Sequence, residues 1–338
     1  MQAFVVHAPG HYGFVDLPTP RPGPGEVLVA PAAVGICGSD MELLDGRRPA
    51  DYVRYPVVPG HEWSGHVVAC GPKVSGLDLG TPVGAEGVRG CGSCASCREG
   101  RPNLCAGPYA ETGFTHPGAL AERLVVPAAL VHPLPAERPI EAAALLEPAG
   151  CVASGLLELG LPRPGSRVAV VGDGSVGLLA VLLVRLTSPG ELLLVGRRPD
   201  RLRLGDVCGA TGTVVVTESA PDDLAGGFDL VIEATNSPSG AVCALHLARR
   251  GGSVLLLGIS GSGRGAIDPD LVSLGQLRGQ GAFAASPAAW RWMVSLYRND
   301  EFDPTPLITH RYPLAEVTNA LEVLATSASG AVKVLITP

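Results

Sequence analysis

The spacing of apolar residues divides the chain into two kinds of segment. Up to about Pro148, short apolar runs of β type, such as residues 26–35 and 122–127, are separated by frequent proline and glycine. This texture predicts an irregular β domain. From about Arg167, continuous apolar runs alternate with segments of helix length. The runs of strand length are residues 167–172, 191–196, 213–216, 229–234 and 253–258. Such alternation predicts a doubly wound parallel sheet, so the expected fold class is α/β.

The rest of the pattern is consistent with this division. Residues 288–300 have a helical pattern, and residues 331–337 have a strand pattern. The most apolar stretch, residues 168–184, contains Asp173 and three glycines and barely reaches the length of a membrane span. A buried strand followed by a buried helix explains it better. With 338 residues, the chain is expected to form two domains.

Charge and the amino-terminal sequence narrow the function classes. The net charge is −7 and no dense Lys/Arg tract occurs, so we expect neither nucleic acid nor membrane as a partner. The first residues lack the basic region and the long apolar run of a signal peptide. We therefore expect a cytoplasmic protein, in which thiols stay reduced.

Four of the nine cysteines lie close together, with the spacing Cys91-x2-Cys94-x2-Cys97-x7-Cys105. Disulfides, a structural metal site and an iron–sulfur cluster are the three alternatives. A reducing compartment disfavours disulfides. The common iron–sulfur spacing has a last gap of three residues followed by proline, unlike the gap of seven found here. Three other cysteines are expected to be small buried residues: Cys70, Cys208 and Cys243.

A glycine pattern follows the first strand of the second half. Gly172, Gly174 and Gly177, with Ser175 and Val176 between them, form a GxGxxG sequence between a predicted strand and a predicted helix. This context is typical of a site that binds the pyrophosphate of a dinucleotide at a helix N-terminus. A chance glycine-rich turn is the alternative.

The end of the next predicted strand bears on the choice of cofactor. NAD sites usually have an acidic residue there, whereas this chain has Gly196, Arg197 and Arg198. A small residue beside guanidinium groups accommodates a 2′-phosphate, so we expect NADP to be favoured, with NAD possible. The alternative is that the two arginines merely begin a solvated helix.

Cys37, His61, Glu62 and Glu147 offer the donor types expected for a catalytic zinc. Taken singly, each has an ordinary structural explanation, such as a small buried cysteine or a hydrogen-bonded core histidine. Their combination with the dinucleotide pattern favours an enzyme.

Together these motifs resemble the zinc-dependent medium-chain alcohol dehydrogenases over essentially the whole chain. Residues 145–150, LLEPAG, resemble the polyol and threonine dehydrogenase branch. The resemblance implies a GroES-like catalytic domain of residues 1–148 and 285–338 with two zinc sites. It also implies a Rossmann domain of residues 149–284.

The resemblance implies a role for each residue of the catalytic site. Cys37 and His61 would ligate the catalytic zinc, Glu62 would be a third ligand or its close neighbour, and Glu147 a direct or water-mediated ligand. Asp40 would orient His61.

The same resemblance implies a proton path and a structural site. Ser39 would hydrogen-bond the substrate oxygen and begin a proton relay. The histidine that often continues this relay in the family is replaced by Glu42. The four clustered cysteines (Cys91, Cys94, Cys97 and Cys105) would bind a structural zinc with no open position.

The implied activity is hydride transfer between a secondary alcohol of a polyol, sugar or aminocyclitol and NAD(P), giving a ketone. Residues 36–40, 55–65 and 113–119 also resemble the aminocyclitol dehydrogenases that oxidise 2-deoxy-scyllo-inosamine. Alternatives are an NADPH-dependent aldehyde or ketone reductase, a non-catalytic NADPH-binding relative, and a zinc-ribbon interaction module. The family is usually dimeric or tetrameric, so a homodimer or homotetramer is expected.

Overall fold

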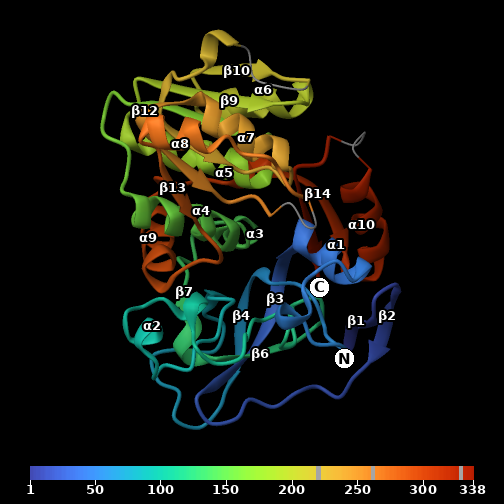
Figure 1. Ribbon diagram of the computed structural model, residues 1–338. Helices are drawn as coiled ribbons and strands as arrows, with labels where there is room; N and C mark the ends of the chain where they lie inside the picture. The colour runs from blue at the N-terminus through green and yellow to red at the C-terminus, as the bar shows by residue number, and fades with distance from the viewer. Residues whose placement is uncertain (218–221, 260–262, 327–329) are drawn as a thin grey trace. The chain divides into compact units, whose positions relative to one another are not determined.

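The chain forms two compact units in a computed structural model, which describes residues 1–217, 222–259, 263–326 and 330–338. Unit 1 contains Met1–Gly150, Ala284–Glu301 and Ile308–Pro338. Unit 2 contains Cys151–Phe283 and Phe302–Leu307. Both chain ends belong to unit 1 (Figure 1).

Unit 1 is built on a β-sheet of mostly antiparallel strands, in the order β14-β15-β3-β4-β5-β7, with β6 also paired to β3. Only the neighbours β14 and β15 are parallel among the pairs of this sheet in the described residues. Strands β1 and β2 form a separate antiparallel pair. The strands are β1 (Gln2–Ala8), β2 (His11–Asp16), β3 (Glu26–Gly35), β4 (Glu62–Cys70), β5 (Pro82–Ala85), β6 (Leu124–Pro127), β7 (Val131–Pro133), β14 (Ile308–Pro313) and β15 (Lys333–Thr337).

Short helices cover this sheet and connect its strands. They are α1 (Gly38–Asp45), α2 (Ala95–Arg98), α3 (Ile140–Ala143), α9 (Pro287–Arg298) and α10 (Val317–Ala325), and α4 (Leu146–Leu159) begins in this unit. The helix predicted at residues 288–300 is α9, and the strand predicted at residues 331–337 is β15. Inward-facing residues of β1, β3, β4 and β15 form one apolar core with α1 and α10.

The register of the sheet places one glycine beside the candidate metal residues. Gly35 of β3 lies opposite Glu62 of β4 and also opposite Leu335 of β15. A Cβ at Gly35 would collide with the carboxylate of Glu62. The Glu62 side chain therefore lies over β3, directed toward the strand that carries Lys333.

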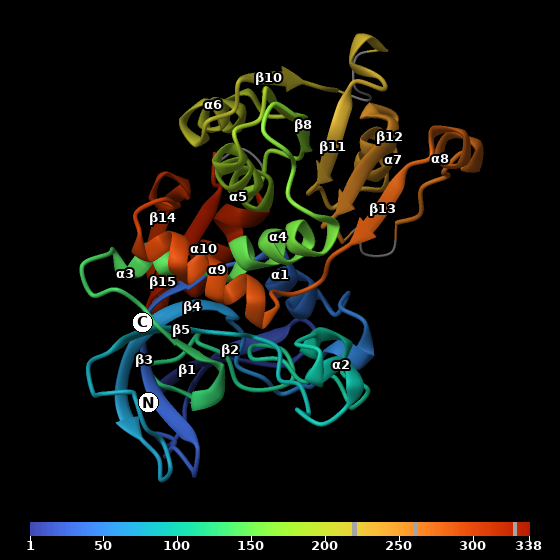
Figure 2. The ribbon, with the colours of Figure 1, turned by 90° about the vertical axis from the view of Figure 1, so that its left-hand side faces the viewer.

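Unit 2 is a six-stranded parallel sheet with the order β10-β9-β8-β11-β12-β13. Figure 2 shows β11, β12 and β13 running side by side. The elements are β8 (Arg167–Val171), α5 (Ser175–Val184), β9 (Glu191–Gly196), α6 (Pro199–Cys208), β10 (Gly212–Val215), β11 (Phe228–Glu233), α7 (Pro238–Leu247), β12 (Ala248–Leu256), α8 (Pro269–Gly275) and β13 (Arg278–Gly281). This order is that of a doubly wound fold, with its switch point between β8 and β11. The predicted α/β fold class is confirmed.

The most apolar stretch of the chain is the buried centre of unit 2. Residues 168–171 of β8 are buried, and so are all residues of α5 from Gly177 to Val184. A helix that is apolar on every face is stable when it is surrounded by other elements. Within the described ranges, no helix combines the length and apolar character that crossing a bilayer requires.

Candidate active site and metal centres

The first predicted metal residue is fixed by the start of α1. Cys37 is the N-cap residue in extended conformation, and its N–H donates to Oδ2 of Asp40 at 2.9 Å. An acidic residue in the first turn satisfies a free N–H and interacts favourably with the helix dipole. Ser39 lies in the same turn, with Oγ 3.8 Å from Sγ of Cys37.

The Asp40 side chain also faces His61, the residue that directly precedes β4. Oδ1 of Asp40 lies 3.4 Å from Nδ1 of His61, and both side chains are buried. Burial alone would raise the pKa of Asp40, but His61 and the Cys37 N–H hold it below its ordinary value. Burial alone would lower the pKa of His61, whereas Asp40 raises it well above the ordinary value. With Nδ1 directed at Asp40, Nε2 is the nitrogen left for a metal.

Three of the four predicted catalytic ligands come together. One donor atom from each of Cys37, His61 and Glu62 lies within 4.8 Å of the other two. Sulfur, imidazole nitrogen and carboxylate oxygen are a donor set that suits zinc with an open position. The residues present therefore fit a catalytic zinc.

Glu147 is not part of that group of three. It lies in the first turn of α4, and its carboxyl group is buried. The pKa of Glu147 is raised to about 7, mainly because the group is buried; the carboxylates of Glu62 and Glu111 also raise it, whereas His61 and Lys333 lower it. The Glu147 side chain therefore lies close enough to Glu62, Glu111 and His61 to interact with their charges.

Lys333 is a residue of this site that sequence reasoning missed. Its Nζ donates to Oε2 of Glu62 at 2.5 Å and to the carbonyl oxygen of Ile36 at 3.3 Å. Both charged side chains are 1% exposed. A buried pair of this kind balances its charges internally, so Lys333 fixes the position of the Glu62 carboxylate.

A second buried ion pair lies beside His61. Arg48 donates from Nη2 to Oε2 of Glu111 at 2.9 Å, and the hydroxyl of Tyr109 donates to the same oxygen at 2.5 Å. The guanidinium of Arg48 lies 3.4 Å from the centroid of the Phe114 ring, and this ring lies 4.7 Å from the ring of His61. We call Arg48, Tyr109, Glu111 and Phe114 the Arg48–Glu111 cluster. Burial raises the pKa of Glu111, although His61 and Arg48 act in the opposite direction.

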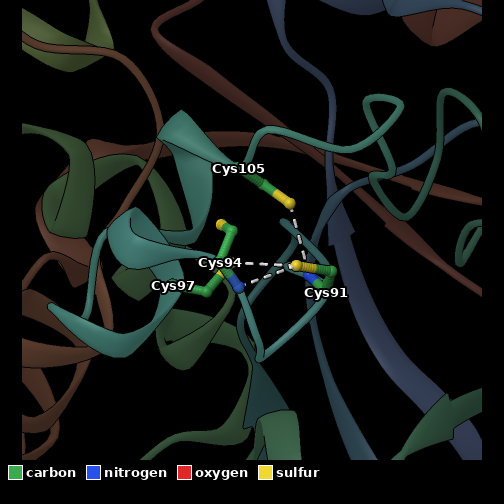
Figure 3. Close-up of side chains that lie close together, drawn as sticks. All are labelled: Cys91, Cys94, Cys97 and Cys105. Atoms are coloured by element: carbon green, nitrogen blue, oxygen red, sulfur yellow. Dashed lines mark hydrogen bonds between the residues drawn. The ribbon is translucent and has the colours of Figure 1, made fainter.

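The four clustered cysteines converge in a loop that contains the short helix α2 (Figure 3). Their sulfur atoms all lie within 4.8 Å of one another, and Sγ of Cys91 lies 4.0 Å from Sγ of Cys97. Four thiolates about 2.3 Å from one zinc would be roughly 3.8 Å apart, so the cluster fits a structural zinc. A hydrogen bond from the Ser93 hydroxyl, with backbone N–H donors, lowers the pKa of Cys91 to about 5. None of these cysteines forms a disulfide.

One expectation about the other cysteines is wrong. Cys208 is buried as predicted, but Cys70 is exposed and Cys243 is only half-buried. Cys70 ends β4 beyond the sheet core, where its side chain faces solvent and donates to the carbonyl oxygen of Leu77.

The glycine loop of unit 2 has the geometry that a dinucleotide requires. Gly172 has φ +128°, and a Cβ there would lie 2.8 Å from the carbonyl oxygen of Ala234. A Cβ at Gly177 would collide with the carbonyl oxygen of Gly172, which explains the close packing of α5 on β8. At Gly174 no protein atom lies within 4 Å of a Cβ position, so this side of the loop is open for a ligand. These are the separate roles of the glycines in a pyrophosphate-binding turn.

The predicted cofactor residues lie around this loop. Ser175 and Val176 begin α5, whose N-terminus has no side-chain cap and can bind a phosphate. Gly196 ends β9, and Arg197 and Arg198 follow it. Sequence reasoning missed the contact that their backbone N–H groups make with Asp173 of the glycine loop.

Comparisons with known proteins agree with this geometry. The family model described as alcohol dehydrogenase GroES-like domain matches residues 23–136, and the model described as glucose dehydrogenase C-terminus matches residues 161–336. The chain is 30% identical to the erythritol/L-threitol dehydrogenase of Mycolicibacterium smegmatis, covering 100% of this chain and 98% of that protein. It is 32% identical to the L-threonine 3-dehydrogenase of Aeromonas salmonicida, covering 94% of each chain.

A solved structure is similar over the same length. A protein of Sinorhizobium meliloti, described as a zinc-binding dehydrogenase bound to NADP, has a TM-score of 0.92 and 31% sequence identity. The match covers 100% of this chain and 99% of that one. The family predicted from the motifs is thereby confirmed. The chain belongs to the zinc-dependent medium-chain alcohol dehydrogenase family.

Proposed function

We propose that this protein oxidises a secondary hydroxyl group of a polyol, sugar or aminocyclitol to a ketone, with hydride transfer to NADP or NAD. The main support for a polar substrate is the Arg48–Glu111 cluster, which lies beside His61. A guanidinium, a carboxyl group and a phenol offer both donors and acceptors to a substrate with several hydroxyl or amino groups. An apolar alcohol would leave these buried polar groups bonded only to one another, whereas a substrate with several hydroxyl groups can add hydrogen bonds to them.

The relatives support a small polar substrate. The two relatives are named for erythritol and L-threitol and for L-threonine. Erythritol and threitol are polyols, and threonine carries a secondary hydroxyl beside an amino group. An aminocyclitol combines the same two functional groups on one ring. We therefore place aminocyclitols, including 2-deoxy-scyllo-inosamine, among the substrates to test.

In this proposal each residue of the site has a defined task. Cys37, His61 and Glu62 hold the catalytic zinc, and Asp40 orients the imidazole of His61 through Nδ1. Zinc bound there supplies a Lewis acid that lowers the pKa of the substrate hydroxyl. Ser39, 3.8 Å from Sγ of Cys37, would hydrogen-bond the substrate oxygen through Oγ and begin the proton relay, giving up its own hydroxyl proton as it receives the proton of the substrate.

Other residues complete the zinc environment and bind the cofactor. Glu147 completes the zinc environment directly or through water. Gly172, Gly174 and the N-terminus of α5 bind the dinucleotide pyrophosphate, and Arg197 and Arg198 favour NADP. The four clustered cysteines hold a structural zinc. We further propose that the enzyme works in the cytoplasm as a homodimer or homotetramer.

The test is an assay of nicotinamide absorbance with erythritol, threonine, myo-inositol, 2-deoxy-scyllo-inosamine and cyclohexanol, each with NADP and with NAD. Cyclohexanol is the matched control, because it has a ring and one secondary hydroxyl without the other polar groups. We expect turnover of a polar substrate that disappears after zinc chelation and in Cys37→Ala. A preference for cyclohexanol over every polar substrate, or turnover that survives both controls, would refute the proposal.

A further inference from the structure

The end of β9 lacks the acidic side chain that usually contacts the ribose of NAD. In such sites a carboxylate about 20 residues beyond the glycine loop accepts hydrogen bonds from the ribose hydroxyls. The corresponding residue here, Gly196, is buried and has no side chain. A Cβ at Gly196 would lie 2.6 Å from both Cβ and Oδ2 of Asp173. The space of the missing side chain is therefore filled by Asp173.

Asp173 reaches this position from the glycine loop. Its Oδ2 accepts the backbone N–H groups of Arg197 and Arg198, each at 2.7 Å. Both hydrogen bonds end on Oδ2, so Oδ1 keeps acceptor capacity for an incoming group. The residue is half-buried, which leaves the carboxylate within reach of a ligand.

We propose that Asp173 is the carboxylate that contacts the adenosine ribose in this dehydrogenase and controls its choice between NAD and NADP. This inference rests on the dinucleotide-binding part of the proposed function. Asp173 supplies from the glycine loop the acceptor that other NAD sites supply from the end of the next strand. A 2′-phosphate at the same point meets a negative charge and competes for the N–H groups that Asp173 occupies.

The arginine side chains around Asp173 have the opposite effect and favour NADP. The side chain of Arg197 is exposed, while Arg198 and Arg201 are half-buried, and Arg201 is attracted by Asp173 and repelled by Arg198. Guanidinium groups attract a 2′-phosphate. The site thus contains an attractive and a repulsive element for NADP, and their balance lets the enzyme accept NAD as well. Removing the repulsive element shifts the preference in one direction, toward NADP.

The test compares the wild-type protein with Asp173→Asn, which keeps an oxygen acceptor for the two N–H groups and removes the charge. Asp173→Ser is a second variant with a smaller side chain. Asp206→Asn is the matched control, since Asp206 is exposed on α6 and its substitution changes the net charge equally. Calorimetry measures the dissociation constants of AMP and of adenosine 2′,5′-bisphosphate, which differ only in the 2′-phosphate.

We expect both Asp173 variants to favour the bisphosphate over AMP by about tenfold or more relative to wild type, because like charges a few Å apart repel strongly. The ratio of kcat/KM for NADP and NAD should rise in the same direction. An unchanged or lower preference for the bisphosphate, or an equal shift in Asp206→Asn, overturns the inference.

These fragments bind without turnover, so the test separates two kinds of failure. Fragment binding with the expected shift, but no activity on any substrate, refutes the proposed substrate class and leaves the role of Asp173 supported. Failure of wild type to bind either fragment refutes the dinucleotide site itself, and the role of Asp173 with it.

Discussion

Replacing Lys333 by methionine should destabilise unit 1 strongly, because the buried carboxylate of Glu62 would lose its countercharge. Lys333 lies 2.5 Å from Glu62, both side chains are 1% exposed, and the same ammonium group donates to the carbonyl oxygen of Ile36. Methionine keeps most of the length of the side chain and removes the charge and its donors. The substitution therefore isolates the electrostatic part of the contact.

The expected magnitude follows from burial. Removing one partner of a buried ion pair costs about 3–5 kcal/mol. The pair Arg311–Glu141 of the same unit has an N···O distance of 2.7 Å, but its side chains are 48% and 38% exposed. Removing Arg311 should cost only about 0.2–1 kcal/mol, so Arg311→Met is the matched control. The double variant Lys333→Met/Glu62→Gln should recover most of the loss, because no uncompensated charge remains.

Urea unfolding followed by tryptophan fluorescence measures this loss in the correct unit. The chain has three tryptophans, Trp63, Trp290 and Trp292, and all of them belong to unit 1. All variants are compared without zinc, because zinc bound to Glu62 would itself act as a countercharge and metal binding contributes to apparent stability. If Lys333→Met loses no more stability than Arg311→Met, or the double variant recovers nothing, the buried pair does not stabilise the site and the reasoning fails.

Three further predictions concern the cysteine cluster, the glycine loop and the Arg48–Glu111 cluster. Cys91→Ser should lower the zinc content by about one ion per chain in elemental mass spectrometry, whereas Cys70→Ser should not; equal zinc in both would contradict a structural site. Gly177→Ala should abolish NADPH binding in a fluorescence titration, because the added Cβ collides with the carbonyl oxygen of Gly172; unchanged affinity would mean that the loop adjusts freely. Tyr109→Phe removes the hydroxyl that donates to Glu111, so the carboxyl group that we propose to contact the substrate loses one of its fixing hydrogen bonds, and KM for the best polyol should rise by about three- to tenfold. An equal rise for cyclohexanol would indicate a general disturbance.

Features that depend on short spacing could be predicted from the sequence. The cysteine spacing predicts a group of four thiols, and the glycine spacing predicts a tight turn between β8 and α5; the structure has both. In each case the chemistry requires given residue types within a few positions, so the pattern is visible before folding. The parallel strands are visible for the same reason, because strands buried on both faces are continuous apolar runs.

Contacts between distant parts of the chain could not be predicted. Lys333 lies in an apolar strand pattern, and only the pairing of β15 with β3 brings it to Glu62. Arg48 and Glu111 are 63 residues apart in segments with no regular period. Strand β13 has the sequence RGQG, with no apolar signal of its own, and pairing with β12 defines it as a strand. In all three cases the tertiary neighbour supplies information that the local sequence lacks.

The position of Lys333 has a consequence for how the protein is made. Cys37, His61 and Glu62 leave the ribosome early, whereas Lys333 follows Glu62 by 271 residues. At a synthesis rate of 5–20 residues per second, this separation corresponds to roughly 14–54 s. During that interval β3 and β4 can pair, but the Glu62 carboxylate has no countercharge and must remain hydrated. The Lys333–Glu62 pair can therefore form only after Lys333 has been synthesised, and zinc that arrives earlier meets Glu62 before this pair exists.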